Sequence, residues 1–370
     1  MKFMLVCGGS AGHINPAIAT ADALRKLMPD CAILFVGAGR AMEKRLVPQA
    51  GYELHNIEML GLSRGFSPKK IKRNAEAAIK LATASRRADK LIRDFQPTAV
   101  IGMGGYICYP VLKAAAKVKI PTVLHESNAV PGLTEKLLSS IVSKIFVSFE
   151  ESRPLFKDPE KVFVAPTPVR ASFLRYTRER ARHDLTLTDE KPVVVSFWGS
   201  LGASGMNEIM KGFITRNIKE ARFHHIHAVG TQDGANSLIE AVSDGKKLPE
   251  FISIRPYIDD MPCIMAASDL VLCRAGGSTL AELAALGRAA VLIPSPFVTN
   301  DHQTTNAKAM ANGGGAVVVR ETECTGDKLF DTVAGILDDK AKLLEMEQRQ
   351  KSLSADDAAA RFAEEIIALL

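Results

Sequence analysis

A strand, a glycine turn and a helix follow one another between residues 270 and 286, and this order strongly limits the possible fold. Residues 270–273 (Leu-Val-Leu-Cys) are typical of a short buried strand and residues 280–286 of a helix, with Gly276 and Gly277 between them. The spacing of Thr279 and Glu282 predicts a capping box. Glycines before a helix also leave backbone amides for an anion, which the helix dipole favours. The pattern alone fits an ordinary α/β crossover equally well.

A second observation favours a ligand site. Residues 289–293 form the next apolar strand, and a polar stretch that includes Asp301, His302 and Gln303 follows it. Open parallel sheets bind ligands beyond the carboxyl ends of their strands. We therefore expect a binding site where these two strands end.

The N-terminus repeats the same order. Residues 3–6 predict a buried strand, Gly8 to His13 a glycine turn, and residues 16–27 a helix. The turn suits a phosphate, diphosphate or sugar, but it lacks the GxGxxG spacing of dinucleotide-binding proteins. His13 is either an ordinary loop residue or a base that takes a proton from a hydroxyl.

Two further strands of this half end in glycines or polar side chains. Residues 98–101 lead into Gly102-Met-Gly-Gly-Tyr106, and residues 121–124 lead into His125-Glu-Ser-Asn128. Together with the first glycine turn, these strands predict a site at the carboxyl edge of a parallel sheet.

The second half restarts the pattern. Residues 192–197 predict a strand that ends at Gly199 and Ser200, and further strands are expected near 223–228 and 253–256. Residues 338–370 predict helices. Pro166 and Pro168 mark an interdomain joint, and 370 residues are too many for one typical core, so two domains are expected.

Composition narrows the cellular setting. Hydrophobic residues make up 47% and charged residues 24% of the chain, which is ordinary for a soluble protein. Six cysteines without a CxxC pair indicate reduced thiols and the cytosol. We expect no membrane span, and an N-terminus that runs from a strand into glycines does not fit a signal peptide.

Positive charge is concentrated in one segment. Residues 64–94 hold ten Lys or Arg and three acidic residues, a net +7 that exceeds the +6 of the whole chain. A helix expected at 68–95 places Ile71 and Ile79 on one side with three alanines. The basic residues form either a solvated face or a surface for anionic lipid headgroups. Nucleic acid is not expected, since no aromatic residues lie among them before Phe95.

Eight motifs in this order and at this spacing resemble a known family over nearly all of the chain. They are Gly-Gly-Ser-Ala-Gly-His13, Gly-Met-Gly-Gly-Tyr106, His-Glu-Ser-Asn128, Pro-Val-Arg170, Gly-Ser-Leu-Gly-Ala203, Tyr-Ile-Asp-Asp-Met261, Cys-Arg-Ala-Gly-Gly-Ser-Thr-Leu-Ala-Glu282 and His-Gln303. The sequence resembles the MurG family of bacterial undecaprenyl-diphosphomuramoyl-pentapeptide N-acetylglucosaminyltransferases.

That resemblance implies an α/β fold of the GT-B type, with two Rossmann-like, doubly wound parallel-sheet domains facing a cleft. Residues 1–164, joined by a returning helix at about 351–370, would take the membrane-bound acceptor, and residues 165–350 would bind UDP-N-acetylglucosamine. The enzyme would transfer N-acetylglucosamine to lipid I with inversion and form lipid II for peptidoglycan synthesis. It would act peripherally at the cytoplasmic face of the bacterial membrane, alongside cell-wall synthesis and division proteins.

The resemblance also implies roles for individual residues. His13 would be the base for the muramoyl 4-hydroxyl, with Glu126 as the next candidate. The acceptor's diphosphate would bind the glycine turns, and Asn128 would approach the donor's sugar. The expected substrate-binding residues are Ser10, Ala11, Gly12, Gly104, Gly105, Tyr106, Asn128, Arg170, Ser200, Ile258, Gly277, Ser278, Thr279, Leu280, Ala281, Glu282 and Gln303.

Within the donor site, Glu282 would accept hydrogen bonds from the ribose, and the backbone at Ile258 would read the uracil. Arg170, Ser200 and residues 277–279 would hold the diphosphate, and Gln303 would contact the sugar. No cofactor or metal is expected, because helix N-termini and Arg170 can stabilise the leaving diphosphate. The adjacent Asp259 and Asp260 do not form a convincing metal site.

The chain departs from the family pattern in three places. Pro166-Thr167 replaces a usual Gly-Asn, which predicts a stiffer joint. Trp198 and Leu201 flank Gly199 and Ser200 in the second glycine turn, and Ala11 replaces a glycine in the first, which restricts its backbone angles.

Two alternatives remain open. One is another GT-B enzyme, either a transferase with a different lipid acceptor or a UDP-sugar epimerase. UDP release that depends on a lipid acceptor would favour transfer over epimerisation. A non-catalytic nucleotide-sugar-binding adaptor would bind UDP-sugar without turnover. The presence of His13, Arg170, Glu282 and Gln303 in one chain favours an enzyme, since an adaptor needs only one half.

Overall fold

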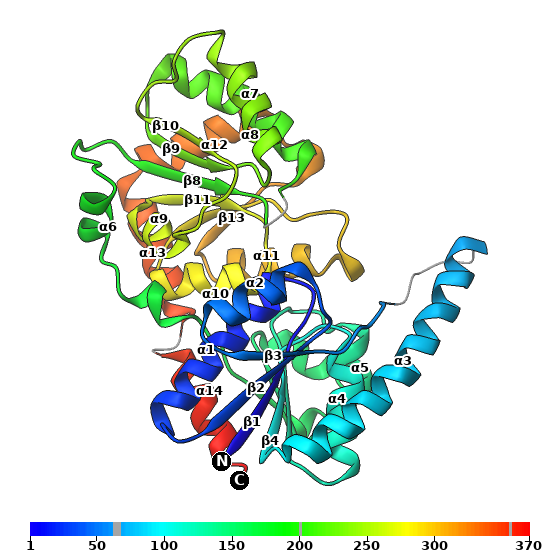
Figure 1. Ribbon diagram of the computed structural model, residues 1–370. Coiled ribbons are helices and arrows are strands. Elements are labelled where there is room, and N and C mark those ends of the chain that lie inside the picture. Colours follow the sequence, from blue (N-terminus) through cyan, green and yellow to red (C-terminus); the bar gives the residue numbers. More distant parts are fainter. Residues whose placement is uncertain (62–67, 200–201, 355–356) are drawn as a thin grey trace. The chain divides into compact units, whose positions relative to one another are not determined.

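The computed structural model describes residues 1–61, 68–199, 202–354 and 357–370. The chain forms two compact units (Figure 1): unit 1 comprises Met1–Arg170 with Asp357–Leu370, and unit 2 comprises Ala171–Asp356. The chain leaves unit 1 after Arg170, which is the end of the proline-containing stretch that the sequence marks as a joint.

Unit 1 is built on a parallel sheet with the order β3-β2-β1-β4-β5-β6-β7. Its strands are β1 (Lys2–Val6), β2 (Ala32–Gly37), β3 (Glu53–Asn56), β4 (Ala99–Gly102), β5 (Thr122–Glu126), β6 (Lys144–Val147) and β7 (Val162–Val164). The central strands are short apolar runs, buried along β4 and β5, as expected for a sheet covered on both faces. The strand order reverses between β1 and β4, which is where such sheets bind ligands.

Helices cover this sheet. They are α1 (Ala11–Leu27), α2 (Ala41–Gln49), α3 (Pro68–Phe95), α4 (Cys108–Lys117), α5 (Leu133–Leu138) and α14 (Ala358–Ile367), with the 3-10 helices η1 (Glu150–Leu155) and η2 (Pro159–Lys161). The expected start of α1 at residue 16 is wrong, because the helix begins at Ala11 and contains Pro16. A proline only removes one amide donor here, and the helix continues through it. His13 therefore lies in the first turn of a helix.

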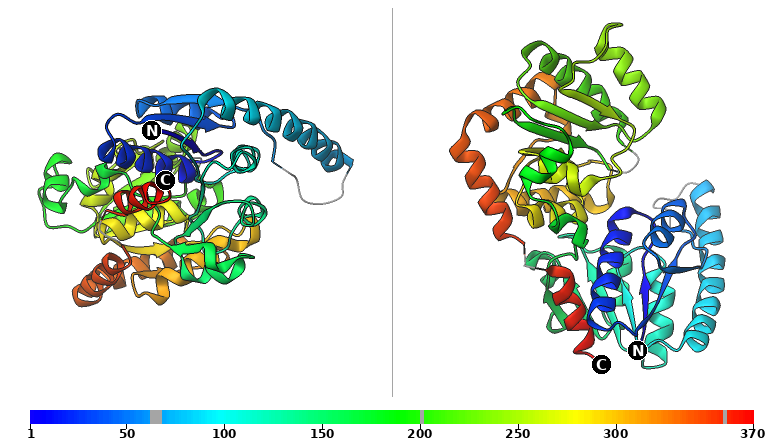
Figure 2. Two further views of the ribbon diagram at one scale, coloured as in Figure 1. Left: turned by 90° about the horizontal axis from the view of Figure 1, so that it is seen from below. Right: turned by 60° about the vertical axis from the view of Figure 1, so that its left-hand side comes forward.

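The last helix belongs to the first unit, as the resemblance implies. α14 lies beside α1 (Figures 1 and 2), and its Phe362 side chain is fully buried. The Phe362 ring meets Phe146 edge-on at 5.0 Å and His125 at 5.4 Å between centroids. Lys144 on β6 forms an ion pair with Glu365. The C-terminal segment thus completes the core of unit 1.

The long helix α3 packs through a different face from the one that its sequence suggests. Ala77, Ala84, Ala88 and Ile92 are buried, and α3 lies against α4. The expected apolar side faces solvent instead, with Ile79 70% exposed. The small alanines on the packed face allow α3 to approach α4 closely, and the larger Ile79 lies on the exposed face.

Unit 2 has a second parallel sheet with the order β10-β9-β8-β11-β12-β13. Its strands are β8 (Val193–Phe197), β9 (His224–Ala228), β10 (Ile252–Arg255), β11 (Leu270–Cys273), β12 (Ala289–Leu292) and β13 (Ala316–Val318). Its helices are α6 (Arg178–Asp184), α7 (Ser204–Glu220), α8 (Gln232–Ser243), α9 (Met261–Ala267), α10 (Gly277–Leu286), α11 (His302–Asn312), α12 (Gly326–Asp338) and α13 (Lys340–Ser352), with the 3-10 helices η3 (Ala171–Leu174), η4 (Thr299–Asp301) and η5 (Glu321–Glu323).

Both units are therefore doubly wound parallel sheets, as the sequence predicts. All six cysteines carry free thiols. Among the residues described, no helix combines the length and the apolar composition that crossing a membrane requires.

A buried polar group lies inside unit 2. The Ser196 hydroxyl lies 2.8 Å from Nε2 of His225 and 2.7 Å from Nδ1 of His227, and all three residues are buried. Burial lowers the pKa of His227 to about 4 and holds the pKa of His225 well below its usual value. Both rings are therefore neutral in the folded protein at neutral pH.

This group predicts acid sensitivity. A histidine whose pKa is lower in the folded than in the unfolded state contributes stability above the unfolded value of about 6.5. For His227 that contribution is lost progressively as the pH falls from about 6.5 to 4. His227→Asn keeps an acceptor near the position of Nδ1 but does not titrate. We expect urea unfolding to show a smaller loss of unfolding free energy between pH 7 and pH 5 in this variant than in the wild type; equal losses would contradict the assignment.

Candidate functional site

Three neighbouring strands of unit 1 bring the predicted residues together. β1, β4 and β5 lie side by side, and their carboxyl ends carry the turns at 7–10, 103–106 and 127–132, the first of which leads into α1 and His13. The Gly8 amide donates to the Gly104 carbonyl at 3.1 Å, which joins the first two turns directly. The edge of the sheet is thus one continuous surface.

His13 lies over this junction with one ring nitrogen fixed. Its Nδ1 atom lies 2.7 Å from the Gly8 carbonyl, which can only accept a hydrogen bond, so Nδ1 carries the hydrogen. Nε2 is therefore an acceptor, the form that a general base needs. Gly104 has a φ of +112°, and a Cβ there would lie 2.5 Å from the His13 ring. Only glycine fits both the backbone and the ring.

A second histidine lies near the first. His125 is buried at the end of β5, and its Nε2 atom has no hydrogen-bond partner within the described residues. Burial, followed by the nearby His13, lowers the pKa of His125 to about 3. His125 is therefore a neutral, structural neighbour of His13. The sequence motif contains it, but nothing in the motif indicates this packing.

Glu126 has both carboxylate oxygens engaged. Oε1 accepts hydrogen bonds from the Asn128 amide and from Asn128 Nδ2, each at 2.9 Å, and Oε2 accepts from the Gly132 amide at 3.1 Å. These bonds fold the loop after β5 around the carboxylate. The geometry favours an organising role for Glu126 over the proton-accepting role suggested as an alternative to His13.

A further buried carboxyl group lies near Glu126. Burial, followed by the charge of Glu126, raises the pKa of Glu135 to about 8, so Glu135 carries a proton at neutral pH. Because only one of the two groups is charged, both can be buried in the same region. The sequence offers no signal for this pairing.

The amides at the start of α1 divide into two sets. The Gly9 amide donates to Glu43 Oε1 at 2.8 Å, so it is not available to a ligand. The amides of Ser10, Ala11 and Gly12 have no partner within the described residues, and the Ser10 side chain does not cap the helix. Three amides and the positive end of α1 remain for an anion.

The two remaining residues of the predicted acceptor site lie in the second turn. The Gly105 carbonyl accepts the Cys108 amide at 3.0 Å, and Tyr106 is 49% exposed. A Cβ added to Gly61 would lie only 2.4 Å from the Tyr106 ring, so the ring fills the space beside this glycine. Tyr106 therefore presents an accessible ring at this edge of unit 1.

Unit 2 has an equivalent edge where β8, β11 and β12 lie side by side. The expected capping box is wrong: α10 begins at Gly277, its N-cap residue is Gly276, and no side chain caps it. Thr279 consequently lies inside the first turn, where its own amide is one of the unpaired donors of the helix start. The loss of the cap leaves more amides for an anion than expected.

Buried side chains hold this turn from behind. Asn306 Nδ2 donates to the Ala275 carbonyl at 2.9 Å, and Arg274 Nη1 donates to the Ile293 carbonyl at 3.0 Å. Arg274 also forms an ion pair of 2.7 Å with Glu321 and lies 5.9 Å from the Trp198 ring centre. The tryptophan that departs from the family pattern is thus a buried part of this support. Arg274 belongs to the sequence motif that ends at Glu282, but this supporting role was not predicted.

The other predicted donor residues are placed as follows. Gln303 accepts the Ser295 amide through Oε1 at 2.8 Å, so it also orders the loop after β12. Ile258 is buried after β10, and Glu282 is half-buried on α10, four residues beyond Ser278. Arg170 is the last residue of unit 1. Leu280 is buried in α10, Ala281 follows it, and Ser200 lies outside the described residues.

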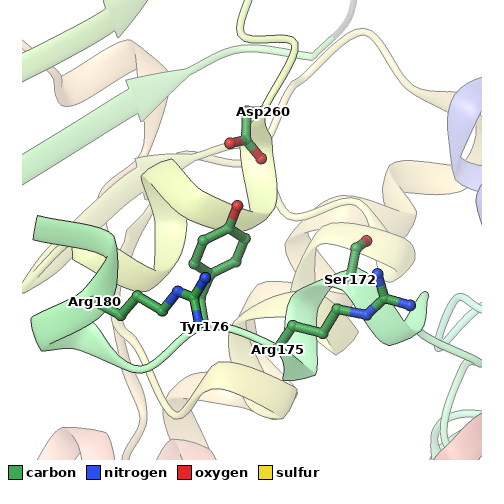
Figure 3. A pocket seen from close by; sticks show the side chains of 5 residues that line it. All are labelled: Ser172, Arg175, Tyr176, Arg180 and Asp260. Carbon is green, nitrogen blue, oxygen red and sulfur yellow. The ribbon is translucent and has the colours of Figure 1, made fainter. Parts of the chain in front are cut away.

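Unit 2 contains a hollow of about 460 Å³ (Figure 3). Its lining residues are Ser172, Arg175, Tyr176, Arg180 and Asp260. The Tyr176 hydroxyl points toward Asp260, whose charge raises the pKa of Tyr176. Asp260 caps α9 and follows Ile258 by two residues, but none of the predicted donor residues lines the hollow.

The residues with described positions contain no group of three or more His, Cys, Asp or Glu side chains that could hold a metal ion. Asp260 accepts the Cys263 amide at 3.4 Å, as a helix cap does.

Two family models match the chain. The glycosyltransferase family 28 N-terminal domain matches residues 3–147, and the glycosyltransferase family 28 C-terminal domain matches residues 193–362. The first match falls within unit 1, and the second spans the sheet of unit 2 and runs into α14 of unit 1.

Curated relatives match over nearly the full length. A protein of Acetivibrio thermocellus is 41% identical over 98% of this chain and 97% of its own, and one of Listeria monocytogenes is 37% identical over 100% of both. Both are named UDP-N-acetylglucosamine–N-acetylmuramyl-(pentapeptide) pyrophosphoryl-undecaprenol N-acetylglucosamine transferase.

Solved structures agree in fold. MurG of Acinetobacter baumannii is 26% identical, with a TM-score of 0.74 over 99% of each chain. S. aureus MnaA, solved with UDP, has a TM-score of 0.70 at 14% identity over 100% of this chain and 96% of its own. At that identity the second likeness shows the fold alone.

Proposed function

The chain belongs to glycosyltransferase family 28, and we propose that it transfers N-acetylglucosamine from UDP-N-acetylglucosamine to lipid I, forming lipid II for peptidoglycan synthesis. The acceptor atom is the muramoyl 4-hydroxyl, and the reaction proceeds with inversion. The observation that carries this proposal is the 41% identity, over 98% of the chain, to a relative named for this transfer. The epimerase alternative has less support, since the epimerases compared share only 12–15% identity with this chain.

His13 provides the base. Its Nδ1–H bond to the Gly8 carbonyl leaves Nε2 to accept the proton of the attacking hydroxyl. The acceptor's diphosphate binds the amides of Ser10, Ala11 and Gly12 at the start of α1, Tyr106 contacts the acceptor nearby, and Asn128 binds the sugar that is transferred. Glu126 fixes the Asn128 side chain by accepting a hydrogen bond from its Nδ2 atom.

The donor occupies unit 2. The amides of residues 277–279, which have no partner among the described residues, and the dipole of α10 hold its diphosphate, aided by Arg170 and Ser200. Glu282 accepts the ribose hydroxyls, the backbone of Ile258 reads the uracil, and Gln303 contacts the sugar. As UDP leaves, the amides stabilise the growing negative charge, so the reaction does not require a metal ion.

Membrane attachment is peripheral and occurs at the cytoplasmic face. The exposed side of α3 combines Ile79 with the basic residues Lys72, Arg73, Arg86 and Arg87. A basic residue near an anionic surface contributes about 1 kcal/mol. An exposed apolar side chain among them adds insertion into the headgroup region. This position brings the acceptor site to its lipid substrate, in the company of other cell-wall synthesis and division proteins.

The first prediction concerns the reaction itself. Purified protein incubated with UDP-N-acetylglucosamine and lipid I should form lipid II with one UDP released per transfer, and the activity should persist in a chelator. Conversion of UDP-N-acetylglucosamine into an epimeric UDP-sugar without lipid I would favour the epimerase alternative, and tight UDP-sugar binding without turnover would favour an adaptor. Complete loss of transfer in the chelator, restored by magnesium, would reveal a metal requirement.

A second prediction separates the roles of the two units. His13→Ala should lower kcat by about 10²–10⁴-fold, the usual contribution of a general base, with unchanged UDP affinity. Its pH profile should lack the rising limb of the wild type. Glu282→Ala should weaken UDP binding at least tenfold, since hydrogen bonds to a charged group contribute about 1.5–3 kcal/mol. His55→Ala, at an exposed histidine of β3, is the matched control. Near-normal turnover of His13→Ala would return the role of base to Glu126.

The third prediction concerns the membrane. The protein should sediment with anionic but not with neutral vesicles, and salt should weaken this binding because charges are screened beyond about 8 Å at physiological ionic strength. Replacing Arg86 and Arg87 with Ala should weaken binding about thirtyfold, from a loss of about 2 kcal/mol. Ile79→Ser should also weaken it, whereas Leu344→Ser, at an exposed leucine of α13, should not. Equal binding to neutral and anionic vesicles would exclude the electrostatic mechanism.

A further inference from the structure

We propose that Glu43 is a positioning residue for the acceptor site: its buried carboxylate holds the Gly9 amide inward and so fixes the turn whose next three amides receive the acceptor's diphosphate. The inference depends on the proposed function only for the identity of that anion. Its structural basis lies entirely within unit 1.

The carboxylate of Glu43 joins two separate segments. Oε2 accepts the Arg40 amide at 3.0 Å, which caps the start of α2. Oε1 accepts the Gly9 amide at 2.8 Å, across 34 residues of sequence. The side chain is fully buried, and it forms no ion pair with any described residue. These two amides are therefore its main compensation for burial.

The surrounding backbone makes room for this carboxylate. A Cβ on Gly37, the last residue of β2, would lie 2.7 Å from Oε2, and a Cβ on Gly8 would lie 3.2 Å from Oε1. Two glycines at the ends of neighbouring strands thus form the hollow that Glu43 fills. A helix cap alone needs no such hollow, since the Arg40 amide is local to α2.

The bond to Gly9 determines where the neighbouring amides are available. The amides of Gly8 and Gly9 donate to Gly104 and Glu43, whereas those of Ser10, Ala11 and Gly12 have no described partner. Without an acceptor beneath it, the Gly9 amide would lose its only partner in the turn. The turn would then rearrange, or the amide would compete for the incoming anion.

A buried negative charge near an anion site also weakens that site. The two amide dipoles directed at the carboxylate offset part of this effect. Any benefit of Glu43 to acceptor binding must therefore come from the shape of the turn. The loss of Glu43 should weaken acceptor binding and leave donor binding unchanged.

Kinetics with four variants test this. Glu43→Leu keeps the volume but removes both acceptors, and Glu43→Gln keeps one oxygen that can still accept the Gly9 amide. Arg40→Pro removes only the amide that Glu43 caps, and the φ of −76° at Arg40 suits proline. Arg40→Ala controls for the lost guanidinium.

We expect Glu43→Leu to raise the KM for lipid I at least tenfold, with the KM for UDP-N-acetylglucosamine within twofold of wild type. Glu43→Gln should restore part of the loss, and both Arg40 variants should resemble the wild type in both KM values. Equal increases in the two KM values would overturn the proposal. So would unchanged kinetics in Glu43→Leu, or an increase in the lipid I KM of Arg40→Pro as large as that of Glu43→Leu.

A measurement on the wild type does not depend on whether the variants fold or on the lipid substrate. In amide hydrogen exchange followed by NMR, Gly9 should be protected and residues 10–12 should exchange rapidly. Inorganic pyrophosphate should then shift the signals of residues 10–12 more than that of Gly9. An unprotected Gly9 amide, or one that pyrophosphate shifts most, would refute the role of Glu43. If these results hold but no lipid II forms, the proposed function fails and the positioning role stands.

Discussion

Each backbone amide has a single hydrogen to donate, and the two sheet edges depend on which acceptors receive those hydrogens. A turn between a strand and a helix must be held by something, and whatever holds it can consume the donors that a ligand would need. In unit 1 the support is an acceptor: Glu43 takes the Gly9 amide. In unit 2 the supports are donors, because Asn306 and Arg274 bond to the carbonyls of Ala275 and Ile293.

This difference suits the two substrates. A turn that is held through its carbonyls keeps its first-turn amides, so in the proposed reaction the start of α10 would present them to the donor's diphosphate. That diphosphate becomes the leaving group and gains negative charge as the glycosidic bond breaks, which makes aligned amides most valuable there. The acceptor's diphosphate does not react, so unit 1 can use one amide for rigidity. His13, the proposed base, is bonded to the same turn through the Gly8 carbonyl.

The sequence was sufficient for the architecture because apolar strands and glycine turns are local patterns. The strand at 270–273, the helix at 68–95 and the convergence of three turns on His13 could all be predicted from neighbouring residues. Cap geometry could not: Thr279 and Glu282 have the right spacing for a capping box, yet the helix begins two residues before Thr279. The supports of the turns were also missed. Glu43 and Gly9 are 34 residues apart, and Arg274 and Glu321 meet only through the fold. Likewise, the alanine spacing of α3 did not reveal which face packs on α4.

The position of α14 has a consequence for biosynthesis. Phe362 fills the core of unit 1 against Phe146, although more than two hundred residues separate them in the chain. During translation, the ribosome completes the whole of unit 2 before this ring emerges. Unit 1 therefore cannot complete its core until then, because Phe146 and His125 still lack their contacts with Phe362, whereas unit 2 can already fold. The N-terminal half of the protein is begun first and finished last.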